Sequence, residues 1–229
     1  MEKTTIEPIA YIRCDFKEKF GIPRQSGRAP SLRSRVIFLP PYNDAEALRE
    51  IEGFSHLWLL FDFSKTRKQG WSATVRPPRL GGNKRVGVFA SRSPFRPNHI
   101  GLSCVKLEQI VDGEHGKELL VSGADLLDGT PIFDIKPYLP FADCIADAKG
   151  GYAQAQEAHR LEVRFDGELA KKLPEDKLQG LCECLADDPR PSYQEDGKAY
   201  GMRFAEFEIK FAVKEGVLTV FEVEKALDA

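Results

Sequence analysis

Before residue 142 the chain alternates short apolar runs with turn-forming segments, and this spacing restricts the possible folds more than any other feature. The runs lie at 8–13, 36–39, 54–63, 86–90, 100–107, 118–122 and 132–135. Such lengths are typical of strands, and one short helix over 43–51, capped by Asn43, fits between them. The almost entirely apolar run at 54–63 is typical of a strand in a closed barrel or buried on both faces. The sequence therefore predicts a compact β-barrel or sandwich.

A different pattern follows residue 142. Residues 143–158 are rich in Ala, Gly, Gln and Asp without apolar periodicity, which favours a linker. A strand at 161–165, a helix at 167–186 broken at Pro174, and a hairpin of 207–213 with 218–223 come next. The helix would bury one stripe: Leu178, Leu181, Cys182 and Leu185. We predict a mainly β protein: a small β-barrel domain over 1–142, a linker over 143–158, and a smaller C-terminal α+β domain over 159–229.

Charge is distributed unevenly behind a formal net charge of −2. Residues 1–107 hold 19 Lys and Arg against 9 Asp and Glu, whereas residues 108–229 hold 14 against 26. Residues 63–107 contain ten cations and no acid, and residues 19–43 form a second acid-free window. A solvent-exposed face rarely carries so many cations without acidic residues among them. The distribution favours a polyanionic partner, nucleic acid above all, without distinguishing RNA from DNA.

The loop at 91–98 places Arg92 and Arg96 among prolines that stiffen its backbone, and it follows the run at 86–90, which we expect to be a buried strand. A rigid loop that carries guanidinium groups at the end of a sheet suits an anionic ligand. Residues 189–191 repeat this arrangement, with Arg190 between two prolines. Residues 65–82 combine cations with Trp71, which would bind RNA by phosphate contact and base stacking, or else pin an insertion to the barrel.

Several other chemistries are not indicated by the sequence. It contains no dinucleotide-binding glycine motif, phosphate-binding loop, zinc-protease motif or serine-hydrolase motif, and its histidines lack metal-ligand spacing. Five scattered cysteines favour reduced thiols. No run reaches the length of a membrane span, and the N-terminus lacks the apolar core of a secretion signal. We expect a cytoplasmic protein with no metal and no membrane association.

Six motifs in order along the chain carry a family resemblance. They are FGIPRQ at 20–25, FSHLW at 54–58, VRPPRLGG at 75–82, GVFASRSPFRPN at 87–98, DGTP at 128–131 and DIKPY at 134–138. Together they closely resemble the TrmO family, also called the TsaA-like or YaeB family, over residues 6–143. DPRP at 188–191 resembles the C-terminal domain of its bacterial members. His99 is a departure, since the family commonly has proline there.

The resemblance implies an S-adenosylmethionine-dependent tRNA methyltransferase that is built on a β-barrel and acts as a homodimer. In this family the methyl group goes to N6 of N6-threonylcarbamoyladenosine, the modified adenosine beside the anticodon. The expected partner is therefore the anticodon stem-loop of tRNA, and the expected cofactor is S-adenosylmethionine.

The resemblance also implies a set of binding residues. The cofactor is expected among Pro23, Arg24, Gln25, Ser64, Lys65, Arg92, Leu102, Asp128, Gly129, Thr130 and Pro131. In this interpretation Arg24 or Arg92 holds the methionine carboxylate, and Asp128 accepts from the ribose or faces the sulfonium. We assign tRNA phosphates to Arg76, Arg79, Lys84, Arg96 and Arg190. The sequence identifies no general base for the reaction.

Two alternatives remain open at this point. One is an RNA-binding module that has the fold but lacks transfer activity. The other is an S-adenosylmethionine-dependent methyltransferase with a small-molecule acceptor, against which the basic first half argues.

Overall fold

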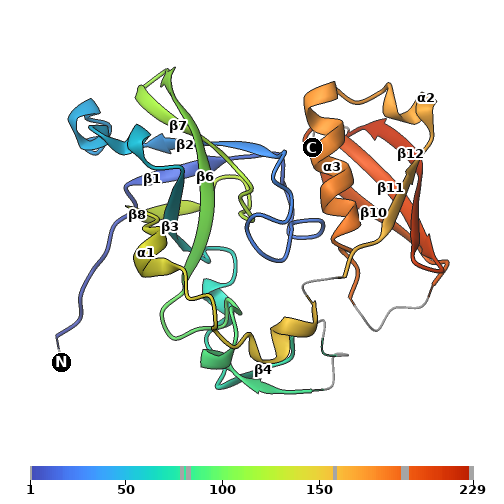
Figure 1. The fold of residues 1–229 in the computed structure, drawn as a ribbon, viewed down its shortest axis with the longest axis horizontal. Coiled ribbons are helices and arrows are strands. Elements are labelled where there is room, and N and C mark those ends of the chain that lie inside the picture. Colours follow the sequence, from blue (N-terminus) through green and yellow to red (C-terminus); the bar gives the residue numbers. More distant parts are fainter. Residues whose placement is uncertain (1, 78–79, 81–83, 157–158, 192–195, 227–229) are drawn as a thin grey trace.

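The computed structural model describes residues 2–77, 80, 84–156, 159–191 and 196–226, and it is mainly β, as predicted (Figure 1). Six antiparallel strands form a closed barrel in the order β1-β2-β7-β6-β3-β8. The ring closes where β8 pairs with β1 through Ala10↔Ile132 and Tyr11↔Pro131. The strands are β1 Ala10–Arg13, β2 Arg33–Phe38, β3 His56–Asp62, β6 Ile100–Gly113, β7 Gly116–Ser122 and β8 Pro131–Pro137.

Side chains that alternate along the strands fill the interior of the barrel. In β6, buried and more exposed residues alternate from Ile100 to Leu107, as a strand with one inward face requires. The fully buried interior residues come from five of the six strands: Ala10, Ile12, Val36, Leu57, Leu59, Leu119, Val121 and Ile132. The hairpin predicted between 102–111 and 118–122 is the β6-β7 pair, which turns between Gly113 and Gly116.

A second, four-stranded sheet forms the C-terminal part in the order β10-β11-β12-β9. Its strands are β9 Glu162–Phe165, β10 Ala199–Phe204, β11 Phe207–Lys214 and β12 Val217–Lys225, and it is accompanied by α2 Gly167–Ala170 and α3 Glu175–Ala186. The helix break at Pro174 and the hairpin are confirmed, whereas β10 was not predicted. The apolar stripe of α3 buries Cys184 and leaves Cys182 half-buried, so the prediction had the wrong cysteine.

The long connection between β1 and β2 joins the two parts of the molecule. Phe16, Ala29 and Leu32 from this connection are buried in the same core as Leu181 and Phe211. In Figure 1, α3 lies between the C-terminal sheet and the barrel. The predicted domain boundaries at 142 and 158 remain a prediction. The second core contains residues from both sides of these boundaries.

The short elements differ most from the sequence prediction. Two 3-10 helices, η1 Ala45–Leu48 and η2 Ile51–Gly53, replace the helix expected over 43–51. Asp44, not Asn43, caps η1 by accepting from the Glu46 amide, while the Asn43 side chain donates to the His115 carbonyl. Other short elements are η3 Arg67–Gln69, β4 Thr74–Val75, α1 Pro140–Asp143 and η6 Gly151–Gln156.

The run at 86–90 is not the buried strand that was predicted. Only Val86–Gly87 is extended, as β5 paired with β4, and Val88–Ala90 forms the 3-10 helix η5. Val88 is buried, but the Phe89 side chain is 76% exposed. The apolar composition of this run is therefore not evidence that all of its side chains are buried. Over the described residues, no helix has the length and apolar character needed to cross a membrane.

We predict that Gly101→Ala destabilises the barrel by about 1–3 kcal/mol, because a Cβ there would overlap the ring of Phe61 on the neighbouring strand. Urea unfolding monitored by circular dichroism measures the change. Gly201→Ala in β10 is the matched control, since a Cβ at that position meets nothing within 4 Å. Equal stability of the two variants would contradict the packing argument.

Candidate functional site

A cavity of about 180 Å³ opens beside the carboxyl end of β3. Residues 61–66 form one wall, Pro94 of the arginine loop another, and Asp125, Leu126, Leu127 and Thr130 a third, with Lys19 and Ile22 completing it. Three of the predicted cofactor residues line this cavity: Ser64, Lys65 and Thr130. Its walls are mostly apolar, with a few charged groups, which is typical of small-molecule sites.

Two carboxyl groups that line the cavity, those of Asp62 and Asp125, were not among the predicted site residues. Asp62 ends β3 and is 5% exposed. Its Oδ2 accepts from Arg67 Nη2 at 2.6 Å, and its buried Oδ1 has no hydrogen-bond partner among the described residues. Asp125 accepts from the Ser103 hydroxyl. Burial raises the pKa of Asp125, although the Ser103 hydrogen bond and the Arg92 charge act in the opposite direction.

A signal for both acids was present in the sequence. Asp62 interrupts the apolar run at 54–63, and Asp125 follows an apolar strand three residues before the DGTP motif. A lone acid at the end of a buried strand has a cost unless it is paired or lies at a site. That criterion marks Asp62 as a candidate, but it does not show that Asp125 meets it at the same cavity.

Two predicted residues from distant segments meet at the rim. Arg92 Nη1 donates to Gln25 Oε1 at 2.6 Å, and Gln25 Nε2 donates to the Arg24 carbonyl. The backbone of the next residue, Ser26, lies close enough to Asp125 to help lower the pKa of that carboxyl group. The Gln25–Arg92 pair therefore lies next to the cavity wall, with the Arg92 side chain exposed.

The DGTP turn is used differently from the prediction. Asp128 Oδ2 accepts from Lys17 Nζ at 2.7 Å and from Arg13 Nη1 at 3.3 Å, and Oδ1 accepts from the Cys14 amide. Burial raises the pKa of Asp128, but the Lys17 contact and the Cys14 amide outweigh it, so the pKa is lowered. The carboxylate thus ties β1 to this turn and is not among the cavity-lining groups, and its predicted role toward the cofactor stays a prediction.

The remaining predicted cofactor residues are dispersed. Gly129 adopts φ +74° in the turn, Pro131 begins β8, and Pro23 is buried. Leu102 is 47% exposed on the outer face of β6. None of these four lines the cavity, so the structure does not bring all eleven residues into one pocket.

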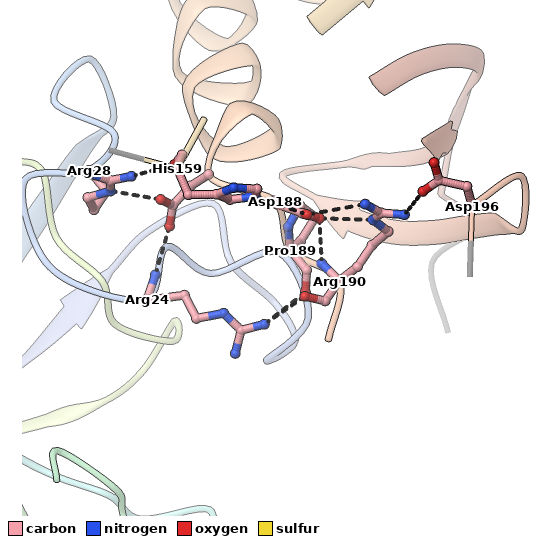
Figure 2. A network of polar contacts seen from close by, with 8 residues as sticks. Arg24, Arg28, His159, Asp188, Pro189, Arg190 and Asp196 are labelled. Carbon is pink, nitrogen blue, oxygen red and sulfur yellow. Dashed lines mark hydrogen bonds and ion pairs between the residues drawn. The ribbon is translucent and has the colours of Figure 1, made fainter. Parts of the chain in front are cut away.

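Arg24 does not point toward an open anion site. Its Nη2 donates to the carbonyls of Pro189 and Arg190, each at 3.2 Å (Figure 2). A guanidinium group that is engaged with two carbonyls of the C-terminal part is poorly placed to hold a methionine carboxylate. Of the two arginines proposed for that role, the exposed Arg92 remains the better candidate.

Arg190 was assigned to tRNA phosphates, and the structure contradicts this. Its side chain is only 10% exposed and forms ion pairs with Asp188 at 3.0 Å and Asp196 at 3.3 Å (Figure 2). The proline-bracketed pattern therefore marks a buried ion-pair cluster here. Arg96 also faces inward: Nη1 donates to the carbonyls of Val88 and Ser91.

The other cations of the basic window remain accessible. Lys65, Lys68, Arg76 and Lys84 are exposed, and none has an ion-pair partner in the described part of the chain. Arg79 lies outside the described residues. Trp71 is 58% exposed, so it does not serve as a buried pin for residues 65–82.

Within the described residues, no group of three or more His, Cys, Asp or Glu side chains is placed to hold a metal ion. The cysteines that the structure describes are all free thiols. Burial raises the pKa of Cys14 to about 12, despite the backbone hydrogen bond of Phe16, so this thiol is not poised as a nucleophile.

Comparison with known proteins covers both parts of the chain. Residues 11–144 match the family model of the tRNA-methyltransferase O N-terminal domain, and residues 158–226 match the TrmO C-terminal domain. The chain is 45% identical to the tRNA (adenine(37)-N6)-methyltransferase of Escherichia coli K12 over 233 residues, covering 98% of this chain and 99% of that protein.

Two further relatives come from Pseudomonas aeruginosa. A putative S-adenosylmethionine-dependent methyltransferase, RcsF, is 45% identical over 213 residues, covering 90% of each chain. A crystal structure of TrmO superposes with a TM-score of 0.78 at 37% identity and covers 97% of this chain and 100% of that chain.

We predict that Arg190→Gln lowers the free energy of unfolding by about 2 kcal/mol at pH 7, somewhat less than the cost of breaking a fully buried pair. Burial raises the pKa of Asp188, but the hydrogen bond and charge of Arg190 outweigh this and lower it. The pair therefore stabilises the fold above the ordinary aspartate pKa and loses its effect as pH falls through the lower folded-state value.

Urea titrations between pH 3 and pH 8 are the measurement, and the difference from the native chain should narrow below about pH 4. Arg164→Gln, which breaks the exposed pair with Glu162, should change stability little at any pH. A deficit in Arg190→Gln that is independent of pH would show that the ion pair is not its cause.

Proposed function

The chain belongs to the tRNA-methyltransferase O (TrmO) family, and from this membership we propose that it is an enzyme that transfers a methyl group from S-adenosylmethionine to tRNA. The proposed acceptor is N6 of N6-threonylcarbamoyladenosine beside the anticodon. The observation that carries the proposal is full-length similarity to a tRNA (adenine(37)-N6)-methyltransferase, combined with a cavity formed at the motifs of the family.

The cavity has features that fit the cofactor. Phe61, Phe63 and Leu126 provide apolar surface for an adenine ring, and the Asp62 carboxylate in the same wall supplies negative charge near a sulfonium. The exposed Arg92 guanidinium, held by Gln25, is available for a carboxylate. We therefore propose Ser64, Lys65, Thr130, Gln25 and Arg92 as the cofactor-binding subset of the predicted residues.

S-adenosylmethionine supplies an activated methyl group, so the protein needs chiefly to align the acceptor nitrogen and exclude water. When bound, S-adenosylmethionine would supply the methyl group to N6, with the electrons of the broken carbon–sulfur bond going to sulfur and the N6 proton released to water. The chain has no histidine in the wall of the cavity, within the residues described. The role that we propose for these residues is to position the acceptor and exclude water.

Binding of tRNA is supported by the accessible cations. Lys65 lines the cavity, and Lys68, Arg76 and Lys84 extend the same basic window, so phosphate contacts beside the cofactor site are feasible. Exposed Trp71 adds an aromatic surface on which an anticodon-loop base can stack. We propose that this surface receives the anticodon stem-loop.

The proposal includes a homodimer and a cytoplasmic location. Ile100 and Leu102 on β6 and Phe141 on α1 leave apolar surface exposed, with Phe141 at 87%. We propose that these side chains contribute to the contact between the two subunits. A cytoplasmic location follows from the proposed substrate, which is tRNA.

We expect the purified protein to transfer labelled methyl from S-adenosylmethionine to tRNA that carries N6-threonylcarbamoyladenosine. The same tRNA without that modification should accept little label, because the proposed acceptor nitrogen belongs to the modified base. Nucleoside digestion and mass spectrometry measure the product. Absence of label in both tRNAs would favour a binding module without activity. Consumption of S-adenosylmethionine at the same rate with either tRNA or with none would favour a small-molecule acceptor.

We also predict that the double variant Arg76→Ala, Lys84→Ala binds tRNA more weakly and with a flatter salt dependence. Each lost phosphate contact should reduce the slope of log K against log salt concentration by about 0.9. Filter binding from 50 to 300 mM salt provides the slope. Lys171→Ala, at the end of α2 and paired with Glu168, is the matched control and should leave the slope unchanged.

A further inference from the structure

The segment 24–31 between β1 and β2 is bound to the barrel on one side. The Cys104 amide of β6 donates to Ser26 Oγ at 3.2 Å, and the Gly27 amide donates to the Gly123 carbonyl at 2.8 Å. Gln25, just before these contacts, accepts from Arg92. The barrel therefore fixes the middle of the segment at the rim of the proposed cofactor site.

The C-terminal part binds the same segment from the other side. Asp187 lies at the end of α3 and is 2% exposed. Its Oδ1 accepts from Arg28 Nε at 2.7 Å, and its Oδ2 accepts from the Arg24 backbone N–H at 3.3 Å. Arg24 in turn donates to the carbonyls of Pro189 and Arg190 (Figure 2).

We propose that Asp187 is a positioning residue for cofactor binding: by holding the backbone at Arg24 and the side chain of Arg28, it fixes Gln25 and, through Gln25, orients Arg92. This inference rests on the proposed function, because it takes Gln25 and Arg92 to be part of the cofactor site. It assigns to the C-terminal part a role in forming a site whose walls come from the barrel.

Docking of the two parts alone does not require Asp187. The β1–β2 connection already buries Phe16 and Leu32 in the second core, and Lys177 on α3 forms an ion pair with Asp15 at 2.7 Å. That ion pair joins the same two parts but lies away from residues 24 and 25 in sequence, at the start of the connection. The contacts of Asp187 instead fall on the residue next to Gln25.

Burial gives Asp187 a precise geometric effect. A carboxylate that is 2% exposed must be satisfied by donors from the protein, and both of its oxygens accept from residues of the 24–31 segment. An asparagine would keep its shape but replace one acceptor with a donor that faces an N–H or a guanidinium. The backbone at Arg24 would then shift, and the 2.6 Å bond between Arg92 and Gln25 would be strained or lost.

The test measures S-adenosylmethionine affinity by calorimetry with the full chain, in Asp187→Asn, Gln25→Ala and the combination of the two. We expect Asp187→Asn to raise the dissociation constant about tenfold or more. In the Gln25→Ala background the same change should add less than about twofold, because the effect passes through Gln25. Thermal unfolding verifies that each variant is folded.

Lys177→Gln is the matched control, since it removes another ion pair between the two parts, the one with Asp15. It should lower thermal stability but leave cofactor affinity unchanged. If Asp187→Asn does not fold, Arg28→Gln removes the same contact from the barrel side and should show the same dependence on Gln25.

Three results would overturn the inference: unchanged affinity in Asp187→Asn, an equal loss in both backgrounds, or an equal loss in Lys177→Gln. Failure of the proposed function is distinguishable from all three. In that case the native chain itself would not bind S-adenosylmethionine, whereas each of the three results presupposes that it does.

Discussion

The structure depends on the burial of the β1–β2 connection between two hydrophobic cores. Its ends are fixed because β1 and β2 are neighbours in the barrel, and its apolar residues Phe16, Ala29 and Leu32 enter the core of the C-terminal part. The connection therefore cannot move independently of either part. Because the FGIPRQ motif lies within it, the residues nearest the cavity inherit their positions from both cores at once.

The arginines show that residue type alone does not identify a ligand-binding side chain. Arg92 and Arg190 both lie in proline-bearing segments, yet Arg92 donates to the Gln25 side chain and stays exposed, while Arg190 is paired with Asp188 and Asp196. The difference comes from acids that approach only in the folded chain. A guanidinium group is equally suited to a ligand phosphate and to a protein carboxylate, so the local sequence cannot decide between them.

The strands and the hairpin were predictable because side-chain alternation survives in the sequence wherever one face of a strand is buried. The run at 86–90 was not, since Val88–Ala90 forms a 3-10 helix with Phe89 exposed, and apolar composition has no period over so short a run. The site was predictable only in part. Ser64, Lys65 and Thr130 meet at the cavity, whereas Asp62 and Asp125 required knowing which strand ends converge there.

The two acid-free windows, which look equivalent in sequence, have different roles in the fold. In the window at 19–43, Arg28 pairs with Asp187 and Arg35 with Glu118, both acids from the second half of the chain. In the window at 63–107, Arg67 pairs with Asp62 and Lys106 with Glu108, whereas Arg76 and Lys84 have no ion-pair partner among the residues described. Part of the acidic excess of the second half is thus consumed inside the molecule. The positive surface left for a polyanion is therefore narrower than the charge count implies, and Lys65 places one of its cations in the cavity wall.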